Sequence, residues 1–137
     1  MNNPKSENRI ENLPFAELEV DDTINHSSLL IKHNYYSSDS EHGRYLLEQY
    51  LNSLLNGDFN IEAIYLIDSA VKLLDSDLHT RDLLIELSEN NNCTIYAAGE
   101  SIDEYGISFS DSCVCELLEA VSIFADTHLT SNLIVIE

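Results

Sequence analysis

Two short apolar segments of the strand type, Ile61–Ile67 and Thr94–Ala98, most constrain the fold, because one helical pattern separates them. Strands joined through a helix need a crossover connection, which is right-handed and makes the two strands parallel. The first segment ends abruptly at Asp68 and the second at Gly99, the start of a polar stretch that closes at Gly106. Loops that follow parallel strands meet at one edge of the sheet, where ligands bind. The sequence therefore places any pocket in these two loops.

Strand and helix patterns alternate along the rest of the chain. We expect five strands, at Ser28–Lys32, Glu62–Ile67, Cys93–Ala98, Ile107–Phe109 and Leu133–Ile136. We also expect three helices. The first runs from a capping box at Ser38–Glu41 to Gly57, the second begins at Thr80–Asp82 and ends at Asn90–Asn92, and the third is amphipathic and covers Val114–Ala125. A short apolar turn is expected at Val71–Leu74. The predicted fold is an α/β three-layer sandwich with a mostly parallel sheet of about five strands.

The chain divides into an arm and one domain. Its 137 residues and 44% apolar content suit a single core, which we assign to residues 28–137. Residues 1–27 contain both prolines and six carboxylates, so we expect a flexible acidic N-terminal arm. Its apolar patch, Leu13–Leu18, offers a contact to the domain or to a neighbouring molecule.

The charge of the chain is extreme, with 25 acidic against 6 basic residues and a formal net charge of -19. After Arg81 no Lys or Arg follows, whereas eleven carboxylates do. Direct binding of nucleic acid is not expected, because that affinity comes from cations that displace counterions from phosphates. Two interpretations stay open: a solvated surface that keeps the protein in solution, or an acidic decoy that mimics nucleic acid toward a basic partner.

Several features bear on location and cofactors. The sequence has no run of 18 apolar residues and no basic, apolar leader, so we expect no membrane association and a cytoplasmic protein. Cys93, Cys113 and Cys115 form no Cys-x-x-Cys pair, which indicates free thiols in a reducing compartment. The five histidines are scattered singly, so no metal site is expected, and nothing in the sequence calls for another cofactor.

Candidate chemistry lies in the two loops and before the last predicted helix. Asp68 and Lys72, four residues apart, either orient an anionic ligand or cap and neutralise a loop. Ser101 follows Gly99 at a predicted helix start, where backbone amides can hold an anion, but no histidine has a context that would make it the base of a nucleophilic serine. Cys113 and Cys115 precede the final helix, whose N-terminus favours a thiolate. Their spacing directs one thiol to the core and the other to the surface.

Short strings carry a family resemblance. Gly43–Leu47, Ser69–Leu73 and Ala98–Ser101 occur in that order, and the last closes in Tyr105-Gly106. Together they resemble the DsrE/DsrF-like sulfur-relay family, closest to the C-terminal domain of YedF-like selenium-metabolism proteins, and the resemblance spans residues 28–137. In that branch the third string usually reads Cys-Gly-Thr-Cys, and its first cysteine holds sulfur as a persulfide. Here the two cysteine positions are Ala98 and Ser101, which supply no thiolate to accept sulfane sulfur.

The resemblance implies a DsrE-like fold and a candidate pocket at the carboxyl edge of the sheet, formed by Tyr36, Asp68, Lys72, Ala98, Gly99, Ser101 and Tyr105. Related families form trimers and hexamers, some with subunits that lack the carrier cysteine, which implies a homo-oligomer or related subunits here. The leading hypothesis is a cysteine-deficient domain that acts by binding, as an oligomer subunit or as a pocket for a small anion, in or near sulfur or selenium metabolism. It is not expected to be an enzyme. The alternatives are a sulfurtransferase that uses Cys113 or Cys115 and the acidic decoy.

Overall fold

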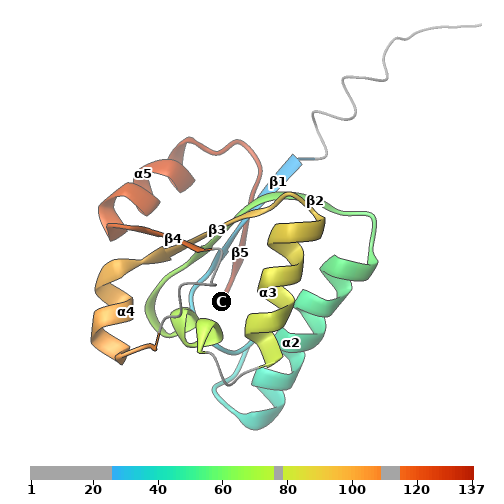
Figure 1. Ribbon diagram of the computed structural model, residues 1–137, viewed down its shortest axis with the longest axis horizontal. Coiled ribbons are helices and arrows are strands. Elements are labelled where there is room, and N and C mark those ends of the chain that lie inside the picture. The colour runs from blue at the N-terminus through green and yellow to red at the C-terminus, as the bar shows by residue number, and fades with distance from the viewer. Residues whose placement is uncertain (1–25, 76–78, 109–114) are drawn as a thin grey trace, which may run out of the picture.

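The computed structural model describes residues 26–75, 79–108 and 115–137, which form one five-stranded sheet with helices on both faces (Figure 1). The strands are β1 (His26–Ile31), β2 (Asn60–Leu66), β3 (Thr94–Ala98), β4 (Cys115–Leu118) and β5 (Leu133–Ile136). Their order across the sheet is β4-β3-β2-β1-β5, and every neighbouring pair is parallel. The predicted α/β sandwich with a parallel sheet of five strands is confirmed.

One face of the sheet carries most of the core. It is covered by α2 (Glu41–Asn56), the 3₁₀ helix η2 (Asp68–Leu74) and α3 (His79–Asn90), with the short helix α4 (Gly99–Tyr105) beside η2. Their leucines pack against alternate strand residues; the cluster includes Leu29, Ile31, Leu47, Leu51, Ile64, Leu66, Leu83, Leu84, Leu87 and Ile95. Because strand side chains alternate between faces, each strand sends every second residue into this core.

The opposite face is covered by α5 (Ala120–Leu129), which Figure 1 shows across the sheet from α2 and α3. Ile123 is fully buried there against Leu30, Ala63, Tyr65 and Ala98. The outward side of α5 is also apolar: Val121 is 68% exposed, Phe124 52% and Leu129 82%. Within the part of the chain that the structure describes, α5 packs on the sheet with one side.

The predicted last helix is wrong in its first half. We expected one helix over Val114–Ala125, but Cys115–Leu118 form β4, hydrogen-bonded to β3, and the helix starts only at Ala120. The fourth strand is therefore not at Ile107–Phe109, since Ile107 and Ser108 belong to no strand. Phe109, Cys113 and Val114 lie outside the described residues. An apolar run this short fits both the helical period of 3.6 residues and the strand period of 2. Here it forms a strand, because it can hydrogen-bond to the edge of β3.

Smaller differences concern the element ends. The cap of α2 is Ser40, whose Oγ accepts a hydrogen bond from the Gly43 backbone N–H at 3.0 Å, and not Ser38 as the capping box predicted. Gly57 ends α2 as expected. Residues 1–25 of the predicted arm lie outside the described residues, while His26 and Ser27 already belong to β1. No helix in the described part of the chain is long and apolar enough to cross a membrane.

Candidate functional site

Asp68 is the centre of a side-chain cluster at the carboxyl edge of the sheet. It begins η2 two residues after the end of β2 at Leu66, and it has a φ of 51°, a left-handed conformation that Asp adopts more readily than most residues. Its backbone N–H donates to Ser101 Oγ at 2.9 Å, and its Oδ1 accepts from the Tyr105 hydroxyl at 2.6 Å. These two bonds tie the loop after β2 to α4, as the sequence predicted for loops after parallel strands.

Lys72 completes this cluster, which we call the Asp68 cluster: Asp68, Lys72, Ser101 and Tyr105. The Lys72 Nζ lies 4.8 Å from the centroid of the Tyr105 ring, within the range of a cation–π contact. Lys32 and Arg44 each have a carboxylate within ion-pair distance, Glu137 and Asp39. None of the ion pairs among the described residues includes Lys72. Its ammonium is therefore available to an anion.

The hydrogen bond to Asp68 changes the acidity of Tyr105. Because only the neutral phenol can donate to the Asp68 carboxylate, this bond raises the pKa of Tyr105 above its ordinary value, and desolvation and the charges of Asp68 and Glu104 act in the same direction. At neutral pH the phenol therefore stays protonated and keeps one lone pair of the Asp68 carboxylate occupied. The remaining carboxylate lone pairs can accept hydrogen bonds from a ligand.

Three residues of the predicted pocket lie apart from the Asp68 cluster. Ala98 is fully buried beneath α5, so its methyl group does not line an open pocket. Gly99 follows it, with room for an added Cβ at 3.8 Å from the Leu118 carbonyl oxygen. Tyr36 is exposed on the loop before α2, where its ring lies 6.1 Å from that of Tyr50. The structure thus brings together four of the seven predicted residues.

The cysteines differ in exposure. Cys93 is buried, and burial raises its pKa to about 12, which keeps its thiol protonated and unreactive at neutral pH. Cys115 is half-buried in the edge strand β4, on the side of the main core, and not before a helix as predicted. Cys113 lies outside the described residues. Within the described ranges, no three His, Cys, Asp or Glu side chains are grouped so that they could hold a metal ion.

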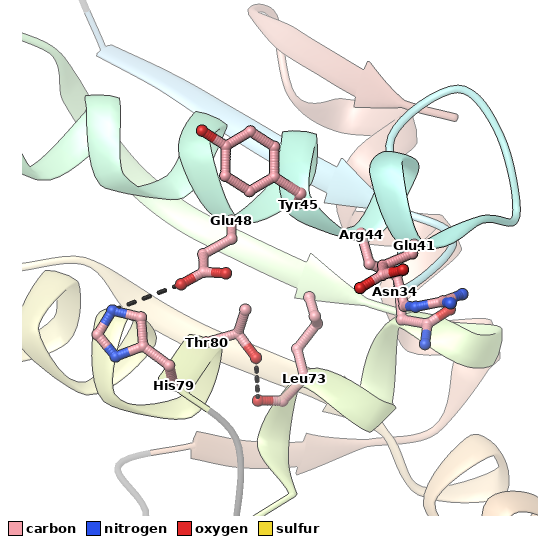
Figure 2. Close-up of a pocket in the computed structure, with 8 residues that line it drawn as sticks. All are labelled: Asn34, Glu41, Arg44, Tyr45, Glu48, Leu73, His79 and Thr80. Carbon is pink, nitrogen blue, oxygen red and sulfur yellow. Dashed lines mark hydrogen bonds and ion pairs between the residues drawn. The ribbon is translucent and has the colours of Figure 1, made fainter.

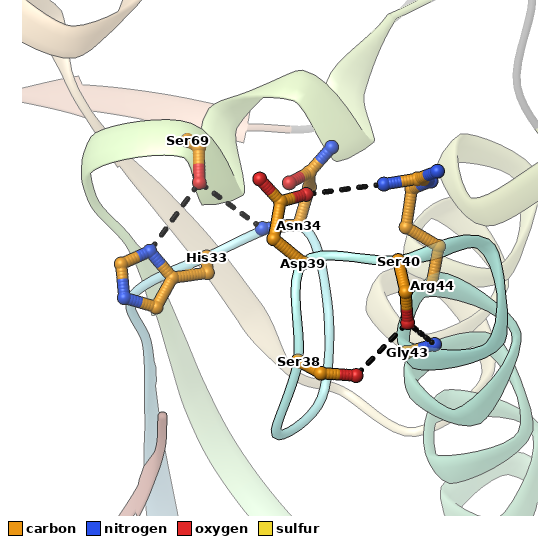
Figure 3. Close-up of polar contacts among 8 residues, drawn as sticks. All are labelled: His33, Asn34, Ser38, Asp39, Ser40, Gly43, Arg44 and Ser69. Atoms are coloured by element: carbon orange, nitrogen blue, oxygen red, sulfur yellow. Dashed lines mark hydrogen bonds and ion pairs between the residues drawn. The ribbon is translucent and has the colours of Figure 1, made fainter.

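Sequence reasoning missed a contact between the loops after β1 and β2. Ser69 Oγ lies 3.4 Å from His33 Nδ1 and accepts a hydrogen bond from the Asn34 backbone N–H at 3.3 Å (Figure 3). The His33 ring stacks on Tyr35 with 4.8 Å between centroids. Because 36 residues separate Ser69 from His33, no local motif could have revealed the pair. This contact holds the two loops together, because the Ser69 hydroxyl already accepts a hydrogen bond from the Asn34 backbone amide.

A second missed contact joins α4 to α5. Glu100 Oε1 accepts a hydrogen bond from the Ala120 backbone N–H at 2.9 Å, at the first turn of α5. A carboxylate at this position satisfies an otherwise unbonded amide and interacts favourably with the helix dipole. Glu100 therefore helps to hold α5 over Ala98.

Comparison with known proteins extends only to the fold. No family model matches the chain, and no curated protein matches it in sequence. A solved structure of a conserved protein of unknown function, BT1422 from Bacteroides thetaiotaomicron, matches with a TM-score of 0.56 and 18% identity over 83% of this chain and 97% of that one. The ychN protein from E. coli matches with a TM-score of 0.53 and 14% identity over 81% of this chain and 98% of its own. These likenesses place the chain among proteins of the YchN/DsrE-like fold.

Proposed function

We propose that this protein acts by binding and not by carrying sulfur. In this proposal it is a cysteine-deficient DsrE-like domain that holds a small oxyanion at the Asp68 cluster, in or near sulfur or selenium metabolism. The observation that carries the proposal is Lys72, whose ammonium has no carboxylate partner among the described residues although the chain is strongly acidic. An unpaired cation at the carboxyl edge of a parallel sheet stands where anionic ligands bind.

The neighbouring carboxylate narrows the class of anion. A fully deprotonated anion beside Lys72 would be repelled by Asp68, which has no proton to donate. An oxyanion that keeps a proton near neutral pH places its charge at Lys72 and donates its hydroxyl to Asp68. Hydrogen phosphate, hydrogen sulfite and hydrogen selenite meet this requirement, whereas sulfate does not.

The residues at the family's carrier position support binding over sulfur transfer. Ala98 has no thiol and is closed off by α5, and the Ser101 hydroxyl is occupied by the Asp68 backbone amide. A persulfide carrier needs a thiolate that its donor and acceptor can reach. Neither residue provides one.

We further propose that the protein works as a subunit of a homo-oligomer or beside related subunits. The outward face of α5, with Val121, Phe124 and Leu129 exposed, supports this proposal. Exposed apolar clusters of this kind are typical of protein interfaces. A second copy packed on this face would cover these exposed apolar side chains.

The anion proposal is tested by isothermal titration calorimetry with phosphate, sulfite, selenite and sulfate. We expect the protonated oxyanions to bind more tightly than sulfate, and Lys72→Ala to weaken them at least tenfold. Lys32→Ala is the matched control, because it also removes one cation from the carboxyl edge. Equal binding by sulfate and phosphate, or equal loss in the two variants, would contradict the proposal.

Sulfur transfer through Cys115 is the second candidate, because its thiol is half-buried while that of Cys93 is buried. Incubation with a cysteine desulfurase and labelled cysteine, followed by mass spectrometry of each cysteine peptide, separates the two candidates. A label on Cys113 or Cys115 that passes to an acceptor would overturn the binding-only proposal. A protein without label on any of its three cysteines would support the binding-only proposal.

A further inference from the structure

A cavity lies at the carboxyl edge, separate from the Asp68 cluster. It has a volume of about 360 Å³ and lies between the first turns of α2, the end of η2 and the start of α3 (Figure 2). It shares no lining residue with the Asp68 cluster; its lining consists of Asn34, Glu41, Arg44, Tyr45, Glu48, Leu73, His79 and Thr80. Its volume falls in the range of small-molecule sites.

The α2 wall of this cavity carries charges of both signs. Glu41, Arg44, Tyr45 and Glu48 follow a spacing of three and four residues, so they lie on one face of the helix. Arg44 and Glu48 stand four residues apart, the spacing at which a helix forms ion pairs. They nevertheless do not pair with each other: Arg44 Nη1 bonds Asp39 Oδ1 at 3.2 Å, and Glu48 Oε2 lies 3.6 Å from His79 Nε2. The two opposite charges are held apart, with the cavity between them.

Each end of the cavity keeps unused hydrogen-bonding capacity. The guanidinium of Arg44 has five N–H donors, of which the bond to Asp39 uses one, and the side-chain amide of Asn34 makes no hydrogen bond to another described residue. At the other end, the Glu48 carboxylate can accept further bonds beside His79. Leu73 and Thr80 lie between the two ends, and the Thr80 hydroxyl is occupied by the Leu73 carbonyl at 3.4 Å, which leaves an apolar middle (Figure 2).

These charges decide the class of ligand. A simple anion would gain Arg44 but would face Glu41 and Glu48, and a simple cation would gain the carboxylates but would face Arg44. A molecule with one carboxylate and one ammonium can pair with Arg44 and with Glu48 at once, and its ammonium offsets the repulsion that Glu41 and Glu48 exert on a simple anion. It also carries no net charge, so the field of a chain with a net charge of -19 does not repel it.

We propose that this cavity binds a free α-amino acid. Its carboxylate is held by Arg44 and Asn34, its ammonium by Glu48, and its side chain lies over Leu73 in the middle of the cavity. The Cβ atoms of residues four apart on one helix face lie about 5–6 Å from each other, so one small molecule can reach both Arg44 and Glu48. The site is independent of the oxyanion site proposed above.

The first experiment is a titration of the isotope-labelled protein with each of the twenty amino acids, followed by amide chemical shifts of α2 and α3. We expect at least one amino acid to shift these resonances in the millimolar range or below. The tightest ligand is then compared by calorimetry with its decarboxylated amine and its deaminated acid, each of which lacks one charge. Each analogue should bind at least tenfold more weakly than the amino acid.

Two variants assign the ends of the ligand. Arg44→Gln should weaken the binding of the amino acid at least tenfold, and this variant should bind the amino acid no more tightly than the decarboxylated amine. Glu48→Gln should bind the amino acid no more tightly than the deaminated acid. Lys32→Gln and Glu86→Gln are matched controls, because they remove the same charges from positions that do not line the cavity. Thermal unfolding checks that each variant is folded. Arg44→Lys keeps the positive charge but loses the paired N–H donors of the guanidinium, so its affinity for the amino acid should lie between those of the wild type and Arg44→Gln.

Four outcomes would overturn the proposal. The first is that none of the twenty amino acids shifts the amides of α2 and α3 at 10 mM, a concentration chosen about tenfold above the millimolar limit of useful affinity. The second is that an analogue with one charge binds as tightly as the amino acid. The third is that the control variants reduce binding as much as Arg44→Gln and Glu48→Gln do. A loss of amino-acid binding in Lys72→Ala would show that the two sites are one, which also contradicts the proposal.

Discussion

The variant Ala98→Cys restores a cysteine at the position where the family resemblance expects the sulfur carrier. The resemblance alone predicts that this thiol points into a pocket near Asp68 and reacts faster than Cys93. The structure predicts the opposite, because the Ala98 side chain is fully buried with Ala63 and Ile123 under α5. We therefore expect the thiol introduced by Ala98→Cys to be protected from solvent and slow to react.

The magnitude follows from Cys93, the buried cysteine of the native chain. Burial raises the pKa of Cys93 to about 12, so about one thiol in 10⁴ is ionised at pH 8, whereas about a quarter of ordinary thiols with a pKa near 8.5 are ionised. Because the thiolate is the reactive species, alkylation should be slower by about three orders of magnitude even before restricted access is counted. The added sulfur atom must also fit into a packed cluster, at a cost of about 1–3 kcal/mol of stability.

Iodoacetamide labelling at pH 8, resolved for each cysteine by mass spectrometry, measures these rates in the native protein and in urea. Cys93 is the buried reference and Cys115 the half-buried one in the same molecule. Urea unfolding gives the stability change. If the introduced thiol reacts in the native protein within tenfold of its rate in urea, α5 does not cover residue 98, and the carrier pocket exists after all.

Three further predictions concern contacts around α4 and α5. Glu100→Ala should lower the free energy of unfolding by about 1 kcal/mol, because it removes the acceptor of the Ala120 amide hydrogen bond. Asp103→Ala on the same helix should lower it less, and equal losses would mean that the Glu100 contact contributes nothing. The raised pKa of Tyr105 means that folding favours the neutral phenol. The contribution of Tyr105 to folding stability is therefore fully present below its unfolded pKa of 10, and it is lost as the pH rises through the higher pKa of the folded protein. The stability of Tyr105→Phe should therefore fall less between pH 9 and 11.5 than that of the wild type, and parallel pH curves would refute this. The mass measured by light scattering should rise with ionic strength as salt screens the charge of -19, and Phe124→Asp should reduce it; a monomer at every salt concentration would exclude the homo-oligomer.

The strands of the sheet were predictable because their residues are apolar over a short run and end at polar ones. Strands β2 and β3 illustrate this, since Asp68 and Gly99 mark where each ends and the carboxyl edge begins. Strand β4 was not predictable in the same way. Val114, Leu117, Leu118 and Val121 fit a helical period, and only the unpaired edge of β3 makes Cys115–Leu118 a strand. That edge is a feature of the folded molecule and not of the local sequence.

The candidate site was predictable in its position but not in its contacts. Parallel strands bring their following loops together, so Asp68 and Ser101 were expected to be close, and they are bonded at 2.9 Å. The bonds of Ser69 to His33 and of Glu100 to Ala120 cross 36 and 20 residues, and polar residues at such separations carry no periodic signal. The opposed charges of Arg44 and Glu48 were visible in the sequence, but their spacing alone predicts that they pair with each other.

The burial of Ala98 depends both on the alternation of side chains along β3 and on the position of α5. In β3 the side chains of Ile95 and Ala97 face the main core, so those of Tyr96 and Ala98 face the other side of the sheet, where Ile123 of α5 is packed. A sulfur carrier at this position would need its thiol open to donor and acceptor, which is incompatible with a helix seated on the side chain. With alanine there, the small methyl group lets Ile123 pack closely while Glu100 bonds the first turn of α5. Ala98, which supplies no thiol, is thus also small enough for Ile123 to close the second face of the sheet over it.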